Sequence, residues 1–427
     1  MQKNIIILLA LCASLTAFAQ PVGHFYFVGA QMYDPCANPF NMRGVNYAPY
    51  NWGYSPNELL LRQISKTGAN TVRLPWYAND PNTAAVYTAA KMQAALDTCT
   101  KYGMLPVIEL HDQTCQNSPT ALIAMSNYYL RADVKAVLLA RQDKVVMNIA
   151  NEALFVNWAS NPTTALTAYK NTYNTIIANL RNAGYYCPIM IDGSECGTNS
   201  DVLAAVGQEL LDNDTQHNLI FSAHAYWYGF ANNDPVVMQQ KMQIMLNTGL
   251  PFVLGEIANQ QDDATMCQYT LPYTNLLTRC QNLGVNWLAW SWYRDGCPNR
   301  QMTSTGNYAN LTPYGNDLVN NTAYGIKKAV KSPFLMGDIT CSNPVATQNK
   351  PIENISIKIA TEATAWQIIS MQNTPLQVRI FTINGQLLSA HTLLENSSIS
   401  VNKPDAHGIY IAQFTDANGN VQNKKLF

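Results

Sequence analysis

Eight short apolar segments recur between residues 40 and 292, and they constrain the fold more than any other feature of the sequence. Successive segments begin about 31 to about 44 residues apart, which is the length of a strand followed by a helix. The intervening stretches, such as 58–67 and 134–141, carry apolar residues at helical spacing. The eight expected strands are 40–47 (FNMRGVNY), 71–76 (TVRLPW), 105–110 (LPVIEL), 144–151 (KVVMNIAN), 188–193 (PIMIDG), 220–226 (IFSAHAY), 251–256 (PFVLGE) and 286–292 (NWLAWSW).

This alternation predicts an α/β fold, a parallel (β/α)8 TIM barrel. A doubly wound open sheet is the alternative, but the chain lacks a G-x-G-x-x-G phosphate loop. From about residue 355 the pattern changes to strict alternation (ISIKI, PLQVRIFTI, SISV, GIYIAQF), which predicts a small all-β sandwich. We therefore expect a barrel domain over 20–332, a Pro- and Asn-rich linker over 333–354, and a sandwich over 355–427.

The first nineteen residues are typical of a cleaved signal peptide. Lys3 supplies the positive charge, residues 5–11 form the apolar core, and Ala17-Phe18-Ala19 is a cleavage site before Gln20. A lipoprotein acylated at Cys12 is the alternative, which the bulky Leu11 disfavours. No other segment is apolar and long enough to cross a bilayer, so we expect no stable membrane insertion.

The composition argues against partners that bind mainly through electrostatic attraction, such as nucleic acids and anionic membranes. Charged residues make up 12% of the chain, hydrophobic residues 48%, and the net charge is −1. We therefore expect no nucleic-acid partner and no binding to anionic membranes. The polar surface must consist largely of Asn, Gln, Ser, Thr and Tyr, which suits an uncharged polar ligand.

Nine cysteines remain after the expected leader, and most of them should form disulfides in an exported protein. Because nine is odd, at least one must stay unpaired. Cys187 and Cys196, and likewise Cys267 and Cys280, are close in sequence, but sequence does not settle the connectivity. No C-x-x-C pair is present and no two histidines have metal-ligand spacing, so we expect no metal site.

Polar and aromatic residues stand where the expected strands end. In a barrel of this kind the carboxyl ends of all strands meet at one face, where function collects. The residues are Arg73, His111, Asn151, Glu152, His224, Tyr226, Glu256 and Trp290.

Two carboxylates on one rim, Glu152 and Glu256, are what glycoside hydrolysis requires. One must donate a proton to the leaving oxygen, and the other must be ionised to attack the anomeric carbon. We expect Arg73 to favour the anionic form of Glu256, and an apolar wall with the negative partner to keep Glu152 protonated. Trp290 offers a flat apolar surface to a sugar ring.

Each of these residues also has a purely structural interpretation. Arg73 could belong to a structural ion pair, and His111 and His224 could be hydrogen-bonded rim residues. Tyr226 lies in an aromatic run, AYWYGF, that packing alone could explain. The combination of suitable residue types at all the expected strand ends favours the functional interpretation.

The motifs RGVNY, NTVRLPW, ELHD, NIANE, FSAHAYWY, LGEIA and LAWSW resemble glycoside hydrolase family 5 over about residues 40–330. The resemblance implies Glu152 as acid/base and Glu256 as nucleophile, with retention of anomeric configuration and no cofactor. It implies that Asn151 binds the sugar 2-hydroxyl, and that Tyr226 and Arg73 orient the nucleophile. His111 and His224 would line the −1 subsite, and Trp290 would form its floor.

Within that family the chain is most similar to the bacterial β-mannanases, so a plant polysaccharide, mannan first, is the expected substrate. An endo-β-1,4-glucanase (cellulase) is the alternative, because the loops YAPYNWGYS, WYANDPNTAAVY and YRDGCPNRQMT depart from the mannanase pattern. An inactive, glycan-binding barrel is the alternative from another class. Candidate platforms for outer sugar subsites, each equally explicable as packing, are Trp52, Trp76, Trp158 and Trp227.

The C-terminal unit resembles the sorting domain of the type IX secretion system, through VRIFTINGQLL, GIYIAQF and the basic end NKKLF. The resemblance implies the secretion machinery as a partner, outer-membrane export, and a secreted or cell-surface location. A carbohydrate-binding module is the alternative, with Trp366 as its sugar platform. We expect the enzyme to be a monomer.

Overall fold

The computed structural model describes residues 23–50, 59–78, 87–227, 234–337, 357–362, 364–382, 387–403, 410–415 and 421–426. The expected leader, Trp52 and most of the expected linker lie outside these residues.

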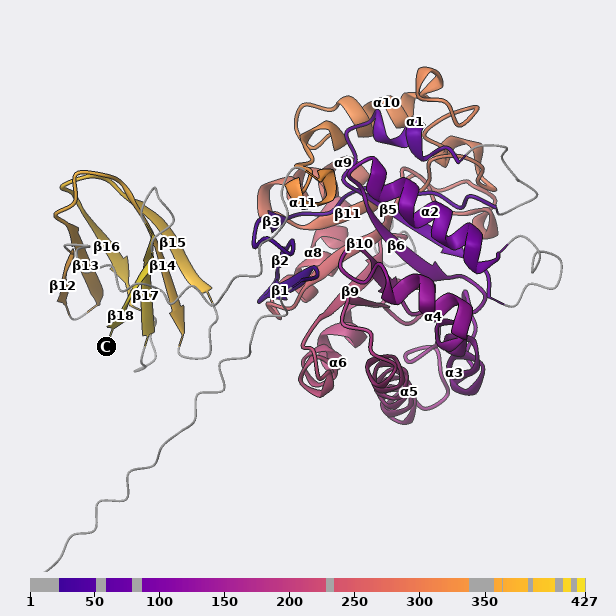
Figure 1. The fold of residues 1–427 in the computed structure, drawn as a ribbon, viewed down its shortest axis with the longest axis horizontal. Coiled ribbons are helices and arrows are strands. Elements are labelled where there is room, and N and C mark those ends of the chain that lie inside the picture. Colours follow the sequence, from indigo (N-terminus) through magenta and orange to yellow (C-terminus); the bar gives the residue numbers. More distant parts are fainter. Residues whose placement is uncertain are drawn as a thin grey trace, which may run out of the picture.

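Eight parallel strands close into a barrel, which confirms the predicted fold (Figure 1). The chain order of the strands is also their order around the barrel, and the last strand pairs with the first. Every residue of these strands is buried, which explains why they read as continuous apolar runs. The strands are β4 (Arg43–Asn46), β5 (Thr71–Trp76), β6 (Leu105–Leu110), β7 (Val146–Asn148), β8 (Ile189–Asp192), β9 (Leu219–His224), β10 (Phe252–Ile257) and β11 (Asn286–Ala289).

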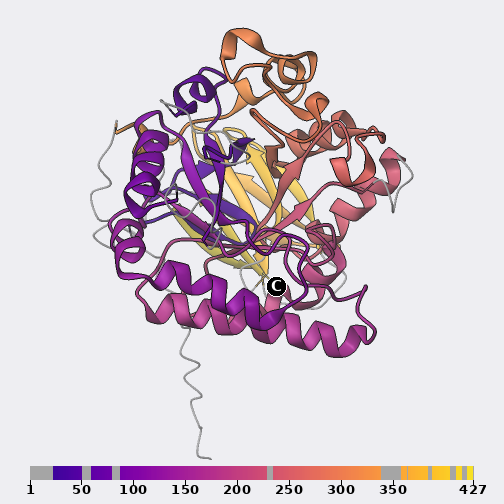
Figure 2. The same cartoon turned by 90° about the vertical axis from the view of Figure 1, so that its right-hand side faces the viewer.

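Helices surround the strands, as the view turned by 90° shows (Figure 2). Several of them begin with a side-chain cap followed by proline, for example Asn161, whose side chain accepts from the amide of Thr164 at the start of α5. The helices are α1 (Leu61–Ser65), α2 (Ala89–Lys101), α3 (Pro119–Ser126), α4 (Ala132–Leu139), α5 (Pro162–Asn182), α6 (Ser200–Asn213), α8 (Pro235–Leu246), α9 (Tyr273–Leu283), α10 (Pro313–Asn320) and α11 (Pro333–Met336).

The amino end of the barrel is closed by a small antiparallel sheet of β1 (Tyr26–Val28), β2 (Gln31–Tyr33) and β3 (Pro39–Phe40). Phe40 was predicted to begin the first barrel strand, but it pairs with Met32 of β2 instead. Its side chain packs with the first residues of the barrel strands, such as Leu105 and Val146. Leu335 of α11 joins this cluster, so the first residues of the expected linker form a helix packed on the barrel.

The C-terminal strands form one sheet of three strands and one of four, all antiparallel, around a shared apolar core. Trp366 lies in that core and is 1% exposed. Trp366, the one candidate platform for the alternative carbohydrate-binding module, is therefore not available to a sugar, because its indole is covered by its own domain. The strands are β12 (Ile357–Thr361), β13 (Ala365–Ser370), β14 (Leu376–Thr382), β15 (Leu387–Leu393), β16 (Ser398–Asn402), β17 (Tyr410–Thr415) and β18 (Val421–Leu426).

Disulfides join loops that are distant in sequence rather than the nearest cysteines. Cys115 pairs with Cys196, which links the loops after β6 and β8, and Cys267 pairs with Cys297, which links the loops after β10 and β11. Cys36 is also disulfide-bonded. Three cysteines in the described part of the chain are free and buried, whereas the odd total required at least one; they are Cys99, Cys187 and Cys280.

No helix in the described part of the chain combines the length and apolarity needed to cross a membrane.

Candidate active site

The eight residues predicted at the strand ends lie together at the carboxyl end of the barrel. Arg73 and Glu256 lie within β5 and β10, and His224 is the last residue of β9. The other five follow β6, β7, β9 and β11 within a few residues. The hydrogen bonds and ring contacts described below connect all eight.

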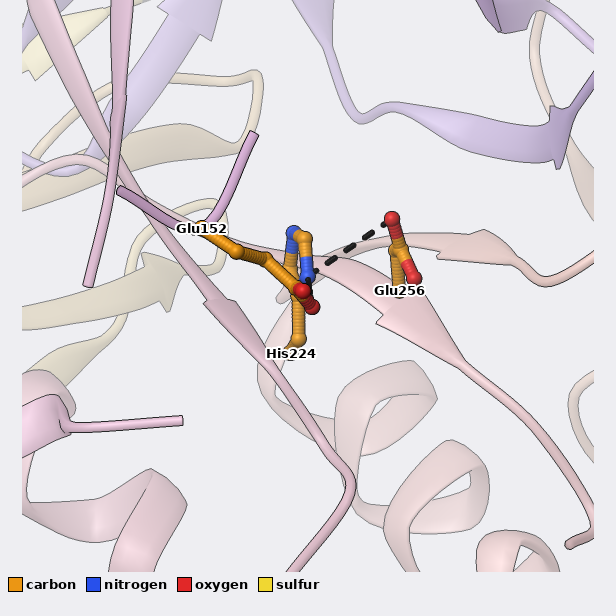
Figure 3. Close-up of side chains that lie close together, drawn as sticks. All are labelled: Glu152, His224 and Glu256. Atoms are coloured by element: carbon orange, nitrogen blue, oxygen red, sulfur yellow. Dashed lines mark hydrogen bonds and ion pairs between the residues drawn. The ribbon is translucent and has the colours of Figure 1, made fainter. Parts of the chain in front are cut away.

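Two carboxylates and one imidazole form the centre of this face. The imidazole of His224 lies between them, with Nδ1 2.6 Å from Oε1 of Glu152 and 3.6 Å from Oε1 of Glu256 (Figure 3). One oxygen of each carboxylate and one nitrogen of the ring all lie within 4.8 Å of one another. This separation is short enough for one sugar ring to contact both carboxylates.

Each oxygen of Glu256 has its own hydrogen-bond donor. Arg73 Nη1 donates to Oε1 over 2.9 Å, and the hydroxyl of Tyr226 donates to Oε2 over 2.9 Å. Burial raises the pKa of Glu256, although the charges of His224 and Arg73 act to lower it. Arg73 therefore contacts the carboxylate as expected, but its attraction does not outweigh the cost of burying the charge.

Arg73 is fully buried and connects most of the polar groups beneath the site. Its Nη2 donates to Oδ1 of Asn151 over 2.7 Å, and the same nitrogen lies 3.2 Å from Oδ2 of Asp192. Its Nε donates to Asn148, and Nη1 also donates to Asn46. A guanidinium with all three nitrogens engaged is fixed in orientation, so it in turn fixes both Asn151 and Glu256.

His224 is held as a cation by the acidic residues around it. Burial acts to lower the pKa of His224, but the charges of Glu256 and Asp192 outweigh burial and raise the pKa to about 10. Burial acts to raise the pKa of Asp192, but His224 and Arg73 outweigh it and lower the pKa to about 2. At neutral pH the imidazolium therefore donates a hydrogen bond to Oε1 of Glu152 through Nδ1.

The surroundings of Glu152 are more polar than the sequence predicted. We expected an apolar wall, but Oε1 contacts His224 and the backbone amide donates to Oδ2 of Asp192 over 3.3 Å. Glu152 has a φ of 52°, so the chain turns sharply after β7 and places this side chain at the carboxyl end of the barrel. Gly197 packs against it, and a Cβ there would lie 2.8 Å from the His224 ring and 2.9 Å from Cγ of Glu152.

An aromatic surface borders the two carboxylates. The ring of Trp290 is stacked with that of His111, with 6.2 Å between centroids and 13° between planes. Nδ1 of His111 lies 3.1 Å from Oε2 of the buried Glu109. Burial acts to lower the pKa of His111, but the charge of Glu109 outweighs it and raises the pKa.

Several residues of the site were missed at the sequence level. Glu109 and Asp192 are the next-to-last residues of the third and fifth apolar runs, which is a signal similar to the one that identified Glu152. Asp295 and Arg300 lie on the loop after β11: Asp295 accepts from Nε1 of Trp290 and, over 2.9 Å, from Arg300. Arg300 lies over the rings of both Tyr226 and Trp290. No periodic pattern marks these two residues, because they lie on an irregular loop.

Glu152, His224 and Glu256 are the group among the described residues whose ligand atoms could converge on a cation. Three of the four carboxylate oxygens already accept a hydrogen bond, since His224 donates to Oε1 of Glu152, and Arg73 and Tyr226 donate to the two oxygens of Glu256. The cationic imidazole has no lone pair to offer a metal. The donor set therefore fits proton transfer better than metal binding.

Residues 33–296 match the cellulase family, glycosyl hydrolase family 5. The mannan endo-1,4-β-mannosidase of Salipaludibacillus agaradhaerens is 26% identical over 328 residues, which cover 75% of this chain and 98% of that protein. That of Cellvibrio japonicus is 29% identical over 342 residues, covering 77% of this chain and 73% of that protein.

Among solved structures, the β-mannanase from Thermomonospora fusca matches with a TM-score of 0.62 and 21% identity, covering 74% of this chain and 100% of that chain. At this identity the likeness concerns the fold. Because the family match spans most of the barrel, the chain belongs to glycosyl hydrolase family 5 and is a glycoside hydrolase.

Proposed function

We propose that the protein is a retaining endo-β-1,4-mannanase that cleaves plant mannan by double displacement. The observation that carries the proposal is the approach within 4.8 Å of oxygens from Glu152 and Glu256. Retaining glycosidases hold their two carboxyl groups about 5–5.5 Å apart, whereas inverting enzymes separate them by about 6.5–9.5 Å to admit a water.

Glu256 is the nucleophile in this proposal. Its two oxygens are held by Arg73 and Tyr226, so the attacking oxygen has a fixed direction. The residue must be ionised to form the glycosyl–enzyme bond. Binding of a sugar brings no further negative charge, and the cations Arg73 and His224 on either side stabilise the ionised form.

Glu152 is the acid/base. It donates a proton to the glycosidic oxygen as that bond breaks, and then accepts one from the water that releases the sugar from Glu256. His224 donates to Oε1 of Glu152 through Nδ1 and therefore orients the carboxyl group for both steps.

The remaining predicted residues bind the sugar at the reacting position. Asn151 is held by Arg73 at Oδ1 and donates from Nδ2 to Thr114, so its amide is fixed where the 2-hydroxyl would bind. Trp290, stacked with His111, provides the apolar floor against which the C–H face of the ring packs. His224 lines the same position, and none of these steps needs a cofactor.

Mannan is favoured as the substrate by the relatives. The two mannosidases named above match most of this chain, and the T. fusca β-mannanase has been solved with mannotriose and mannohexaose. Cellulose or another β-glucan is the second candidate. A relative from Caldicellulosiruptor saccharolyticus, 25% identical over 283 residues, is named β-mannanase/endoglucanase A.

A substrate panel tests the proposal. We expect reducing ends to appear with galactomannan and glucomannan at rates at least about tenfold above those with carboxymethylcellulose and xylan, a difference of ~1.4 kcal/mol in transition-state binding. A rapid fall in the viscosity of galactomannan, ahead of sugar release, would show cleavage within the chain. Faster cleavage of carboxymethylcellulose than of both mannans would replace the assignment with endoglucanase.

We also propose that the enzyme is exported to the medium or the cell surface, with residues 1–19 as a cleaved signal and 355–427 as a type IX sorting domain. The leader pattern and the strand motifs of the C-terminal unit support this proposal. The burial of Trp366 supports it further, because it removes the proposed platform of a carbohydrate-binding module.

Deletion of residues 355–427 tests the export proposal in a host that carries the secretion system. We expect mannanase activity to move from the medium and cell surface to the periplasm, with unchanged specific activity. The full-length Glu256→Gln variant, followed by immunoblotting, controls for effects of activity on export. Equal export of the truncated and full-length chains would contradict the assignment.

A further inference from the structure

The four tryptophans considered as outer sugar platforms differ in their exposure. Trp76 and Trp227 are fully buried in the main core of the barrel domain. Trp158, by contrast, is 57% exposed. Of the three that lie within the described residues, Trp158 is therefore the one whose indole is available to a ligand.

Trp158 lies on the loop between β7 and α5, six residues after Glu152. The ring of Phe155 contacts it edge to face, with 5.2 Å between centroids and 60° between planes. Residues 153–161 (ALFVNWASN) carry no charged side chain. The loop that follows Glu152 thus presents an aromatic, uncharged surface.

A buried carboxylate fixes this loop. Glu195, 1% exposed, accepts hydrogen bonds from the successive backbone amides of Val156, Asn157 and Trp158. The side chains of Ser194 and Asn199 donate to its other oxygen. Three amides converging on one carboxylate oxygen hold the backbone of 156–158 in a single conformation.

Neighbouring loops also hold this segment in place through hydrogen bonds. The amide of Leu154 donates to the carbonyl of Gln116 over 2.8 Å, and that of Phe155 donates to the side chain of Asn117 over 3.0 Å. The disulfide between Cys115 and Cys196 ties these neighbouring loops to each other. Because the backbone is already ordered, a ligand that stacks on Trp158 loses little further loop entropy on binding.

We propose that Trp158, supported by Phe155, is a sugar-binding platform on the leaving-group side of the cleavage point. This inference rests on the proposed function, in which Glu152 protonates the departing oxygen. The part of the glycan beyond that oxygen extends on the side of Glu152, whose loop carries Trp158, whereas Tyr226 contacts the nucleophile Glu256. The occupant is the reducing-end portion of a β-1,4-linked mannan chain, whose sugar faces stack on the indole.

Two substrates with different leaving groups separate this role from others. Mannohexaose places sugars on both sides of the cleaved bond, whereas 4-nitrophenyl β-mannobioside has a leaving group without sugar. For Trp158→Ala we expect kcat/KM on mannohexaose to fall about tenfold, equivalent to ~1.4 kcal/mol. We expect kcat/KM on the aryl mannobioside to stay within about twofold of wild type. Transfer of mannosyl groups to added mannobiose, relative to hydrolysis, should fall in parallel.

Two control variants accompany this experiment. Trp158→Phe keeps an aromatic surface and should retain a part of the activity on mannohexaose. Tyr186→Ala removes another exposed aromatic residue, 45% exposed, from the loop before β8 at the opposite end of the barrel. It should leave kcat/KM on both substrates unchanged. Thermal unfolding of each variant verifies the fold.

The outcomes distinguish the two proposals. Unchanged cleavage of mannohexaose by a folded Trp158→Ala variant would overturn the platform while leaving the mannanase assignment intact. An equal loss on both substrates would also overturn it, because the residue would then act on the other side of the cleaved bond. A wild-type enzyme that cleaves neither substrate would refute the proposed function and this inference with it.

Discussion

Replacement of Glu256 by glutamine is expected to lower kcat on mannan by about 10⁴-fold or more, as removal of a covalent nucleophile does in other enzymes. The amide has nearly the same shape, so Oε1 of the new residue can still accept from Arg73 or Tyr226. An amide oxygen does not form the glycosyl–enzyme bond, however. The expected result is therefore a folded protein that binds mannohexaose but does not cleave it, as measured by calorimetry and by reducing-sugar release.

The matched control is Glu209→Gln. Glu209 lies on α6 and forms an exposed ion pair with Lys170, so the same chemical change there should leave kcat, KM and thermal unfolding unchanged. Activity of Glu256→Gln within tenfold of wild type would remove Glu256 from the role of nucleophile. Loss of binding together with loss of fold would instead show that the carboxylate serves mainly to neutralise the buried Arg73.

The barrel could be predicted from sequence because its strands are buried on both faces. Thr71–Trp76 and Leu105–Leu110 are predicted to the residue, since apolar runs and strands coincide there. The fourth run, 144–151, extends past β7 because its last residues, up to Asn151, belong to the turn that presents Asn151 and Glu152. The first run is longer than β4 because Phe40 belongs to β3, in the small sheet that closes the amino end of the barrel. An apolar pattern does not distinguish a residue of that sheet from a residue of a barrel strand.

The positions of the site residues could be predicted because barrel topology alone brings strand ends together. The pKa shifts of these residues could not be predicted from the sequence, because burial and neighbouring charges act on each pKa in opposite directions. For Glu256 burial prevails and its pKa is raised, whereas for Asp192 the neighbouring cations prevail and its pKa is lowered. Loop residues such as Glu195 and Arg300 were missed for another reason: their partners are set by tertiary contacts between loops, which leave no periodicity in the sequence.

Replacement of Glu152 by alanine is expected to lower kcat/KM on mannan by about 10³-fold, within the range that general acid–base catalysis contributes. Aryl mannobiosides with good leaving groups need no protonation, so the first step should remain fast and the glycosyl–enzyme should accumulate. Azide should then restore turnover, because this small anion enters the space left by the carboxyl group and needs no general base. The measurement is steady-state turnover of 4-nitrophenyl β-mannobioside with and without azide.

The pH dependence of the variant provides a second readout. In the proposed mechanism Glu256 must be ionised to attack, and burial raises its pKa, so activity should be lost with falling pH at values above the ordinary glutamate pKa of 4.5. This acidic limb should persist in Glu152→Ala, since Glu256 is still present. The alkaline limb that reports the protonated acid should disappear with activated substrates, because no proton is donated.

The configuration of the azide product assigns the two carboxylates independently of rates. In Glu152→Ala, azide attacks the anomeric carbon of the glycosyl–enzyme and Glu256 leaves, so the two inversions give the β-mannobiosyl azide. In Glu256→Ala no covalent intermediate forms, and azide can react only by a single inversion from the space of the missing nucleophile, which gives the α-azide. An α-product from the Glu152 variant would exchange the roles of the two residues, and absence of any azide product would remove Glu152 as the acid/base.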